Sequence, residues 1–412
     1  MGSVPQHPTP PPPLPPTPVS FYGDRGEFRR LVMRGTGLEL VTVGFYRFWL
    51  ATDIRRHLWS NTDVGDYAAE YTGRGKELLL GFLFALAILV PIYLLYFLIG
   101  LEAERAKAFA SLPLVLFFYL FGQFAIYRAR RYRLTRTVWC GVRFWMSGSG
   151  WAYAARSALW AILVILTVGL MLPWREAALE RYKMGHSYYG DLPGSFDGRG
   201  LEFFKRGWWL WLTVVVLLLI GVVGSIPHSF VPIPLPLAKT AFQIAPFLSL
   251  CMLVAAPFLY GAFKAVEWRW WLSGIRFGDV WLESALSPTA LIGLYWKVIG
   301  WMLLLLLFFA GYMFATLSLV ASVSQTPMAK LFMPGNLQAN IPMIGFMAVG
   351  YLALILAMNV IMRIYLLRDV WARVVSSTTV HNIEAAANVS AKGELANALG
   401  EGFADGLDVA GF

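Results

Sequence analysis

The stretch that decides the fold is residues 55–78, which read RRHLWSNTDVGDYAAEYTGRGKEL. Two arginines follow an apolar segment, and a Val-Gly-Asp turn signal at 64–66 then separates two short polar and aromatic segments. This pattern predicts a β-hairpin. The Gly-Arg-Gly element at 73–75 predicts a turn into the next helix. Glu77 falls in the first turn of that helix, where a carboxylate suits the free amides and the helix dipole.

The same arrangement recurs 125 residues later in the chain. Residues 42–77 and 167–202 are identical at 11 of 36 positions without a gap, and the Gly-Arg-Gly element is among them. Three weaker copies follow apolar runs elsewhere, so we predict an internal duplication. The five predicted hairpin copies lie around residues 60–72, 134–147, 187–197, 272–284 and 375–389.

Long uncharged runs dominate the rest of the chain. Of its 412 residues, 58% are apolar and 14% are charged, against roughly 25% charged residues in an ordinary soluble domain. Six runs reach about 20 residues, the length that crosses a bilayer core. They are Leu78–Gly100, Ala108–Tyr127, Gly207–Ile226, Thr240–Phe263, Val298–Ser322 and Ala339–Met362. The predicted fold is an α-helical polytopic membrane protein with about six transmembrane helices and repeated short cytoplasmic β-hairpins between the helices.

Basic residues gather around the predicted hairpins. The hairpin regions hold 27 lysines and arginines, whereas the loops that join paired apolar runs hold four. The positive-inside rule therefore places every hairpin and both termini in the cytoplasm. On this topology a cysteine at position 107 or 232 is accessible from outside, and one at 66 or 191 is not.

Two apolar segments do not fit this count as single crossings. Full crossings at 38–59 and 151–184 would put a basic hairpin outside the cell. Both segments contain Thr-Val-Gly, at Thr42–Gly44 and Thr167–Gly169, where a helix can break. We therefore predict two re-entrant or interfacial helical elements. The sequence leaves open whether these segments span, re-enter or lie at the interface, and seven or eight crossings are the alternative.

The predicted organisation has four parts. They are a Pro-rich disordered cytoplasmic tail (1–18), a first repeat half with membrane helices and hairpins (19–150), a second, longer repeat region (151–395) and a cytoplasmic C-terminal tail (396–412).

Arginine and glycine pairs are the first candidate site. Glycine amides at a helix start favour an anion, and arginine adds a fork of donors, so these residues are candidates for contact with lipid phosphate. The alternative is a tight turn with topology-setting arginines, and we expect positive φ at Gly73 and Gly198. The candidate lipid-phosphate or turn residues are Arg56, Gly73, Arg74, Gly75, Glu77, Arg131, Arg181, Gly198, Arg199, Gly200 and Glu202.

Polar residues inside the apolar runs are the second candidate site. Gln123, Gln243 and Asn359 either hydrogen-bond a neighbouring helix or line a substrate path. The charges at run edges, such as Lys264, Glu267 and Arg363, are open to the same two readings, as snorkelling side chains or as a conduction path. The scattered histidines and two cysteines show no metal-ligand spacing,. We predict no catalytic residue, metal site or cofactor.

The first repeat resembles a known family. The stretches Gly44–Trp49, Arg55–Thr62 and Glu70–Leu78, together with Gly400–Asp405 in the tail, are similar to the YjgN-like family of bacterial inner-membrane proteins, which has a domain of unknown function. The resemblance implies a bacterial inner-membrane location and multi-pass topology. It implies no catalytic or binding residue.

Two functions stay open. One is a transporter or channel-like protein; the other is a non-transporting membrane module whose cytoplasmic hairpins form a platform for lipid headgroups or a protein partner. The expected partners are the lipid bilayer and anionic phospholipid headgroups rather than nucleic acid, and a protein partner or homo-oligomer stays open. Because a lone hairpin is marginal in water, we expect at least three hairpins to assemble into a shared β-structure, with Arg56, Arg131 and Arg181 near lipid phosphates.

Overall fold

The computed structural model describes most of the chain. The described residues are 15–105, 111–225, 235–325, 327, 328, 331, 341–397, 402 and 405, with side chains left undescribed at 101–105, 111, 112, 217–225, 235–246, 248–253 and 342. The predicted disordered tail lies mostly outside this range. Thr17 and Pro18 were predicted to be disordered, but they belong to strand β1.

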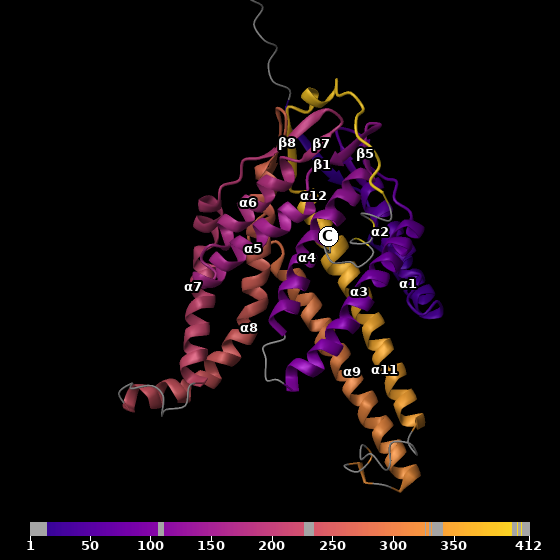
Figure 1. Cartoon of the computed structure of the whole chain (residues 1–412), viewed down its shortest axis with the longest axis vertical. Coiled ribbons are helices and arrows are strands. Elements are labelled where there is room, and N and C mark those ends of the chain that lie inside the picture. The colour runs from indigo at the N-terminus through magenta and orange to yellow at the C-terminus, as the bar shows by residue number, and fades with distance from the viewer. Residues whose placement is uncertain are drawn as a thin grey trace, which may run out of the picture.

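Eleven short strands form one antiparallel sheet, which lies at one end of the molecule with the long helices leading away from it (Figure 1). The strand order is β3-β2-β1-β11-β10-β9-β8-β7-β6-β5-β4. The strands are β1 (Thr17–Phe21), β2 (Thr62–Val64), β3 (Tyr67–Ala68), β4 (Glu70–Tyr71), β5 (Thr137–Trp139), β6 (Val142–Met146), β7 (Ser187–Tyr189), β8 (Leu192–Phe196), β9 (Ile275–Phe277), β10 (Val280–Ser284) and β11 (Thr378–His381).

The sheet closes on itself at Ala69. Strands β3 and β4 stand at opposite ends of the strand order, yet Ala69 alone separates them in the chain. One extended stretch therefore pairs with β2 through its first half and with β5 through its second half. Among the described strands, the unpaired edges are therefore only the two residues of β3 and the two of β4, too short to invite pairing with another chain.

The prediction that the hairpins assemble is confirmed. All five predicted copies contribute strands to the sheet, four of them as hairpins. The fifth copy, at 375–389, is not a hairpin, because β11 is followed by a 3₁₀ turn at Ile383–Ala386. The N-terminal strand β1 takes the missing place and pairs with both β11 and β2.

Helices fill the intervals between strands. They are α1 (Arg25–Val41), α2 (Arg47–Ser60), α3 (Gly75–Arg105), α4 (Ser111–Thr135), α5 (Gly150–Leu166), α6 (Leu172–Met184), α7 (Gly200–Ser225), α8 (Leu235–Gly274), α9 (Ile292–Ser324), α11 (Ile341–Ile361) and α12 (Val370–Val375), with a π-helical segment at Met362–Asp369. Among the described residues, three helical stretches are long and apolar enough to cross a membrane: Gly75–Gly100, Ile292–Ser324 and Met343–Val375. The long helices diverge from one another as they lead away from the sheet (Figure 1).

The two Thr-Val-Gly elements break helices, as predicted. Val43 and Gly44 have φ of 52° and 86°, and the aligned Val168 and Gly169 have φ of 50° and 84°. In each copy the threonine hydroxyl donates to the carbonyl four residues earlier, at 2.7 Å, and accepts from the amide four residues later. Helices α1 and α5 therefore end here, and α2 and α6 lead the chain back to the sheet. Both pairs start and finish at the sheet, while the placement of these elements at a membrane stays a prediction.

Close glycine–tryptophan contacts seat the next helix in both copies. A Cβ on Gly75 would lie 2.9 Å from the Cα of Trp49, and one on Gly200 would lie 2.8 Å from the Cα of Trp174. The glycine at the start of α3 and of α7 thus lets the helix approach the backbone of the preceding helical pair. The aligned positions share local geometry, while the duplication itself stays a prediction.

This contact predicts the effect of one methyl group. Gly75→Ala forces a Cβ against backbone that cannot move aside, so we expect a loss of about 1–3 kcal/mol in the free energy of unfolding. The measurement is thermal unfolding of the purified protein in detergent. The control is Gly122→Ala in α4, where a Cβ would meet nothing within 4 Å. If both variants unfold at the wild-type temperature, the packing argument is wrong.

Candidate functional site

The predicted arginine–glycine pairs lie where helices meet the sheet. Arg56 Nη2 donates to the carbonyl oxygen of Gly73 at 3.3 Å, and Arg181 Nη2 donates to that of Gly198 at 3.5 Å. Arg74 and Arg199 are exposed beside them, just before α3 and α7. The structure therefore brings Arg56 to Gly73 before α3, and Arg181 to Gly198 before α7. Exposed guanidinium groups remain at both places.

The turn argument for these glycines is wrong. Neither Gly73 nor Gly198 is among the positive-φ residues of the chain. Glycine is needed for space instead: a Cβ on Gly73 would lie 2.6 Å from the ring of Tyr71, and one on Gly198 would lie 2.5 Å from the ring of Phe196. Each glycine sits over the aromatic ring two residues before it.

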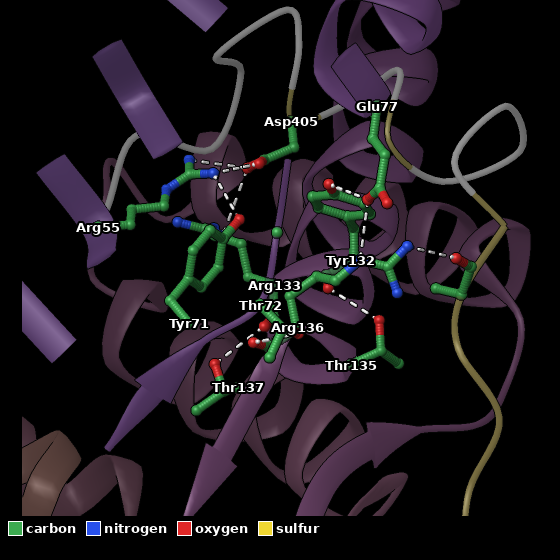
Figure 2. Close-up of polar contacts among 12 residues, drawn as sticks. Arg55, Tyr71, Thr72, Glu77, Tyr132, Arg133, Thr135, Arg136, Thr137 and Asp405 are labelled. Carbon is green, nitrogen blue, oxygen red and sulfur yellow. Dashed lines mark hydrogen bonds and ion pairs between the residues drawn. The ribbon is translucent and has the colours of Figure 1, made fainter. Parts of the chain in front are cut away.

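The two first-turn glutamates have different surroundings. Glu77 accepts hydrogen bonds from Arg136 Nε at 2.9 Å and from the Tyr132 hydroxyl at 2.7 Å (Figure 2). The aligned Glu202 is exposed. Glu77 therefore ties α3 to the end of α4, which sequence reasoning missed. Arg131 is half-buried on α4.

A second buried network lies next to Glu77 (Figure 2). Arg55 Nη2 donates to Asp405 Oδ1 at 3.0 Å, Arg55 Nη1 donates to Asp405 Oδ2, and Arg133 Nε lies 3.6 Å from Oδ1. Burial would lower the pKa of Arg55, but Asp405 outweighs it and raises that pKa. The predicted C-terminal tail is thus anchored on the protein at Asp405, 350 residues from its partner Arg55.

A third network gathers ionisable side chains from α4 and α6. Glu180 accepts from Arg130 Nη1 at 2.8 Å and pairs with Lys183, and its side chain is 9% exposed. Burial would raise the pKa of Glu180, but Lys183 and Arg130 outweigh it and lower the pKa to about 2. Burial raises the pKa of the neighbouring Glu176 despite Arg175 beside it. These residues were not candidates from the sequence, since they are spread over two repeat regions.

A polar chain extends from this third network between helices. Arg175 Nη2 donates to Ser157 Oγ at 3.2 Å, and Ser157 Oγ donates to Gln123 Oε1 at 3.0 Å. Gln123 is the one predicted intramembrane polar residue that the described contacts join to other helices. Asn359 donates to Ile355 of its own helix at 3.0 Å and is exposed. Gln243 lies where the side chains are outside the described residues.

The charges at the run edges form ion pairs. Arg363 makes two hydrogen bonds, of 3.0 and 2.8 Å, to the carboxylate of Glu39 on α1. Lys264 donates to Glu267 at 2.6 Å. Within the part of the chain that the structure describes, no group of three or more His, Cys, Asp and Glu side chains is placed to hold a metal ion.

The fold defines a mostly helical protein with candidate membrane-spanning helices attached to a sheet whose two ends meet at Ala69. A family model described as bacterial protein of unknown function, DUF898, matches residues 16–406. The chain therefore belongs to this YjgN-like family, as the resemblance of its first repeat indicated. A search of curated proteins gave no match, and a search of solved structures gave none either.

The Glu180 network predicts a pH dependence of stability. Because the folded pKa is about 2, below the ordinary value of about 4.3, the stabilisation is fully present above pH ~4.3 and is lost as the pH falls toward 2. Glu180→Gln leaves two cations unpaired, and we expect a cost of about 3–5 kcal/mol at neutral pH. The gap in unfolding temperature between wild type and variant should narrow from pH ~4.3 downward.

The matched control is Glu283→Gln, which changes an exposed contact between a carboxylate and the His381 ring. An exposed pair contributes at most about 1 kcal/mol. A gap between wild type and Glu180→Gln that stays constant down to the lowest measurable pH would contradict the assignment of the shifted carboxyl to Glu180.

Proposed function

We propose that this chain is a multi-pass inner-membrane protein whose sheet faces the cytoplasm as a binding platform. The observation that carries the proposal is that strands from every part of the chain join in one sheet, from which the long helices lead away (Figure 1). The closed sheet is the recognition element, and the helices are its anchors.

The exposed apolar surface supports membrane embedding. In the most apolar windows of the three candidate spans, 17%, 0% and 6% of residues are buried. The turn between α1 and α2 exposes Val41 and Val43, and that between α5 and α6 exposes Ile165 and Val168. Apolar patches of this kind mark contact with lipid. The proposal therefore has six crossings in three pairs, with the tips of α1–α2 and α5–α6 dipping into the same leaflet.

The exposed arginines at the helix starts define the proposed lipid contact. Arg74 and Arg199 lie just before α3 and α7, and the guanidinium groups of Arg56 on α2 and Arg181 on α6 reach the same two turns. Under the proposed topology these guanidinium groups are at the level of the headgroups. Guanidinium suits phosphate because its donors match two oxygens at once. We name these four arginines the rim and propose that they bind anionic phospholipid headgroups.

Transport is the second candidate, and one observation favours it. The hydrogen-bonded chain Gln123–Ser157–Arg175 joins α4, α5 and α6. Arg175 also pairs with Glu176 on α6. Ionisable groups at membrane depth often mark ion or proton paths. Against transport, the long helices splay instead of packing into a bundle around a shared site (Figure 1).

A native cysteine tests the sidedness. Cys140 is exposed in the turn between β5 and β6. In cells that carry Cys251→Ser, we expect a membrane-impermeant maleimide to label Cys140 only after the inner membrane is opened. Val323→Cys, in a variant that also lacks Cys140, serves as the control, because Val323 is 77% exposed near the far end of α9. Labelling of Cys140 in sealed spheroplasts would place the sheet outside and end the proposal.

Lipid retention tests the rim. In native mass spectrometry of the purified protein, Arg74→Gln with Arg199→Gln should reduce the bound phosphatidylglycerol several-fold. Arg29→Gln with Arg30→Gln, which removes two exposed arginines of α1, should leave the bound lipid unchanged.

Flux through proteoliposomes tests the transport alternative. Ion or solute flux that exceeds that of empty vesicles and disappears in Ser157→Val would favour transport over the platform.

A further inference from the structure

Two buried guanidinium groups converge at the place where α2 and α4 meet the sheet. The side chains of Arg55 and Arg133 are 11% and 16% exposed, and the carboxylate of Asp405 between them is 2% exposed (Figure 2). We call this place the Arg55–Arg133 recess. Two buried arginines that face one position form an anion site whatever the anion is, because a guanidinium group carries donors and no acceptor.

The donors of the recess are held by elements other than the C-terminal tail. Arg55 is on α2, and its Nη1 also donates to the hydroxyl of Tyr71 on β4 at 3.3 Å, with the guanidinium carbon 5.8 Å from the centre of that ring. Arg133 is on α4. Arg55 and Arg133 thus stand on elements that meet at the sheet, separate from the segment that carries Asp405.

The occupant is a side chain from the far end of the sequence. Both oxygens of Asp405 accept from Arg55, and one of them also faces Arg133. A phosphate group offers more acceptor oxygens and a larger negative charge than a carboxylate, and arginine binds both with the same fork of donors. The recess is therefore chemically suited to a ligand that would replace Asp405.

A third arginine, in the neighbouring Glu77 network, has an unpaired donor. Arg136 is 5% exposed; its Nε donates to Glu77 and its Nη2 donates to the carbonyl oxygen of Ala396 (Figure 2). Its Nη1 is buried and has no hydrogen-bond partner among the described residues. A buried unpaired donor carries an energetic cost, but Arg136 belongs to the Glu77 network and adds no donor to the recess.

We propose that the Arg55–Arg133 recess binds a phosphate group and that Asp405 is the chain's own competitor for it. The Asp405 carboxylate then acts as a tethered competitor, and phosphate binding displaces that carboxylate from the two arginines. The phosphate comes either from a lipid headgroup or from a soluble phosphate. The recess shares no residue with the rim, so a failure of the rim experiment leaves this proposal standing.

Removal of the Asp405 carboxylate tests the proposal in the full-length protein. If the tethered carboxylate fills the recess about 90% of the time, Asp405→Asn should tighten the apparent Kd for inorganic phosphate roughly tenfold, as read from thermal unfolding in neutral detergent. Adding Arg55→Gln should abolish the gain. The control is Asp191→Asn, which removes the exposed carboxylate that accepts from Ser390 at 3.0 Å. An equal response to chloride at matched ionic strength, or no gain in Asp405→Asn, overturns the proposal.

Chemical rescue covers the case in which Asp405→Asn folds poorly. Loss of the carboxylate leaves the buried Arg55 and Arg133 without their counter-ion. Removal of one partner of a buried ion pair lowers the free energy of unfolding. Millimolar phosphate should then restore the yield and unfolding temperature of Asp405→Asn, whereas chloride at the same ionic strength should not. A variant that phosphate fails to rescue contradicts the proposal.

Nanodiscs separate the two phosphate sources. Stabilisation of Asp405→Asn by inorganic phosphate in phosphatidylcholine discs assigns a soluble phosphate. Stabilisation that requires phosphatidic acid in the disc assigns a lipid headgroup. Stabilisation in neither preparation overturns the proposal.

Discussion

Backbone pairing on the two sides of Ala69 is the constraint on which the rest of the structure depends. The Ala69 amide donates to Thr62 at 3.1 Å, and the Thr72 amide donates to Arg136 at 2.8 Å, so one short stretch joins both ends of the sheet. A closed sheet leaves no freedom in where each hairpin sits. Because most of the described long helices begin or end within a few residues of a strand, closure also fixes the positions from which these helices leave the sheet.

Helix α4 shows how closure brings distant charges together. Its last turns and the residue that follows it carry a row of arginines. Arg130 faces Glu180 of α6, Arg133 faces Asp405, and Arg136, just after the helix, faces Glu77. One helix therefore links the two regions that the sequence aligns as copies. The ion pairs lie at the boundary between sheet and helices, where α4 passes from apolar surroundings to the sheet.

Local patterns in the sequence predicted much of this fold. The Val-Gly-Asp and Gly-Arg-Gly signals predicted the hairpins and the start of α3, and Thr42–Gly44 and Thr167–Gly169 predicted the helix breaks, because each of these features depends on neighbouring residues. The strand order was not predictable in this way. The pairing of β1 with β11 joins residues more than 350 positions apart, and no turn signal encodes it.

The candidate sites also divide into contacts between residues close in sequence, which were predictable, and contacts between distant residues, which were not. Arg56 and Gly73, or Arg181 and Gly198, lie close in sequence, and their contact follows from the turn that joins them. Asp405 was outside every predicted site, since its partners Arg55 and Arg133 lie on two other helices. Gly73 was assigned to the right place for the wrong reason, because the ring of Tyr71 and not the backbone φ excludes a side chain there.

Disulfide formation between β4 and β5 and between β1 and β11 tests closure most directly, because both strand pairs join distant parts of the chain. In a protein without its native cysteines, the pairs Glu70→Cys with Val138→Cys and Thr17→Cys with Val380→Cys lie opposite each other in the sheet. Closure predicts that both pairs cross-link in the same molecule in native membranes, while Glu70→Cys with Thr137→Cys, one residue out of register, does not. Cross-linking of the out-of-register pair alone, or of neither in-register pair, would contradict the closed sheet.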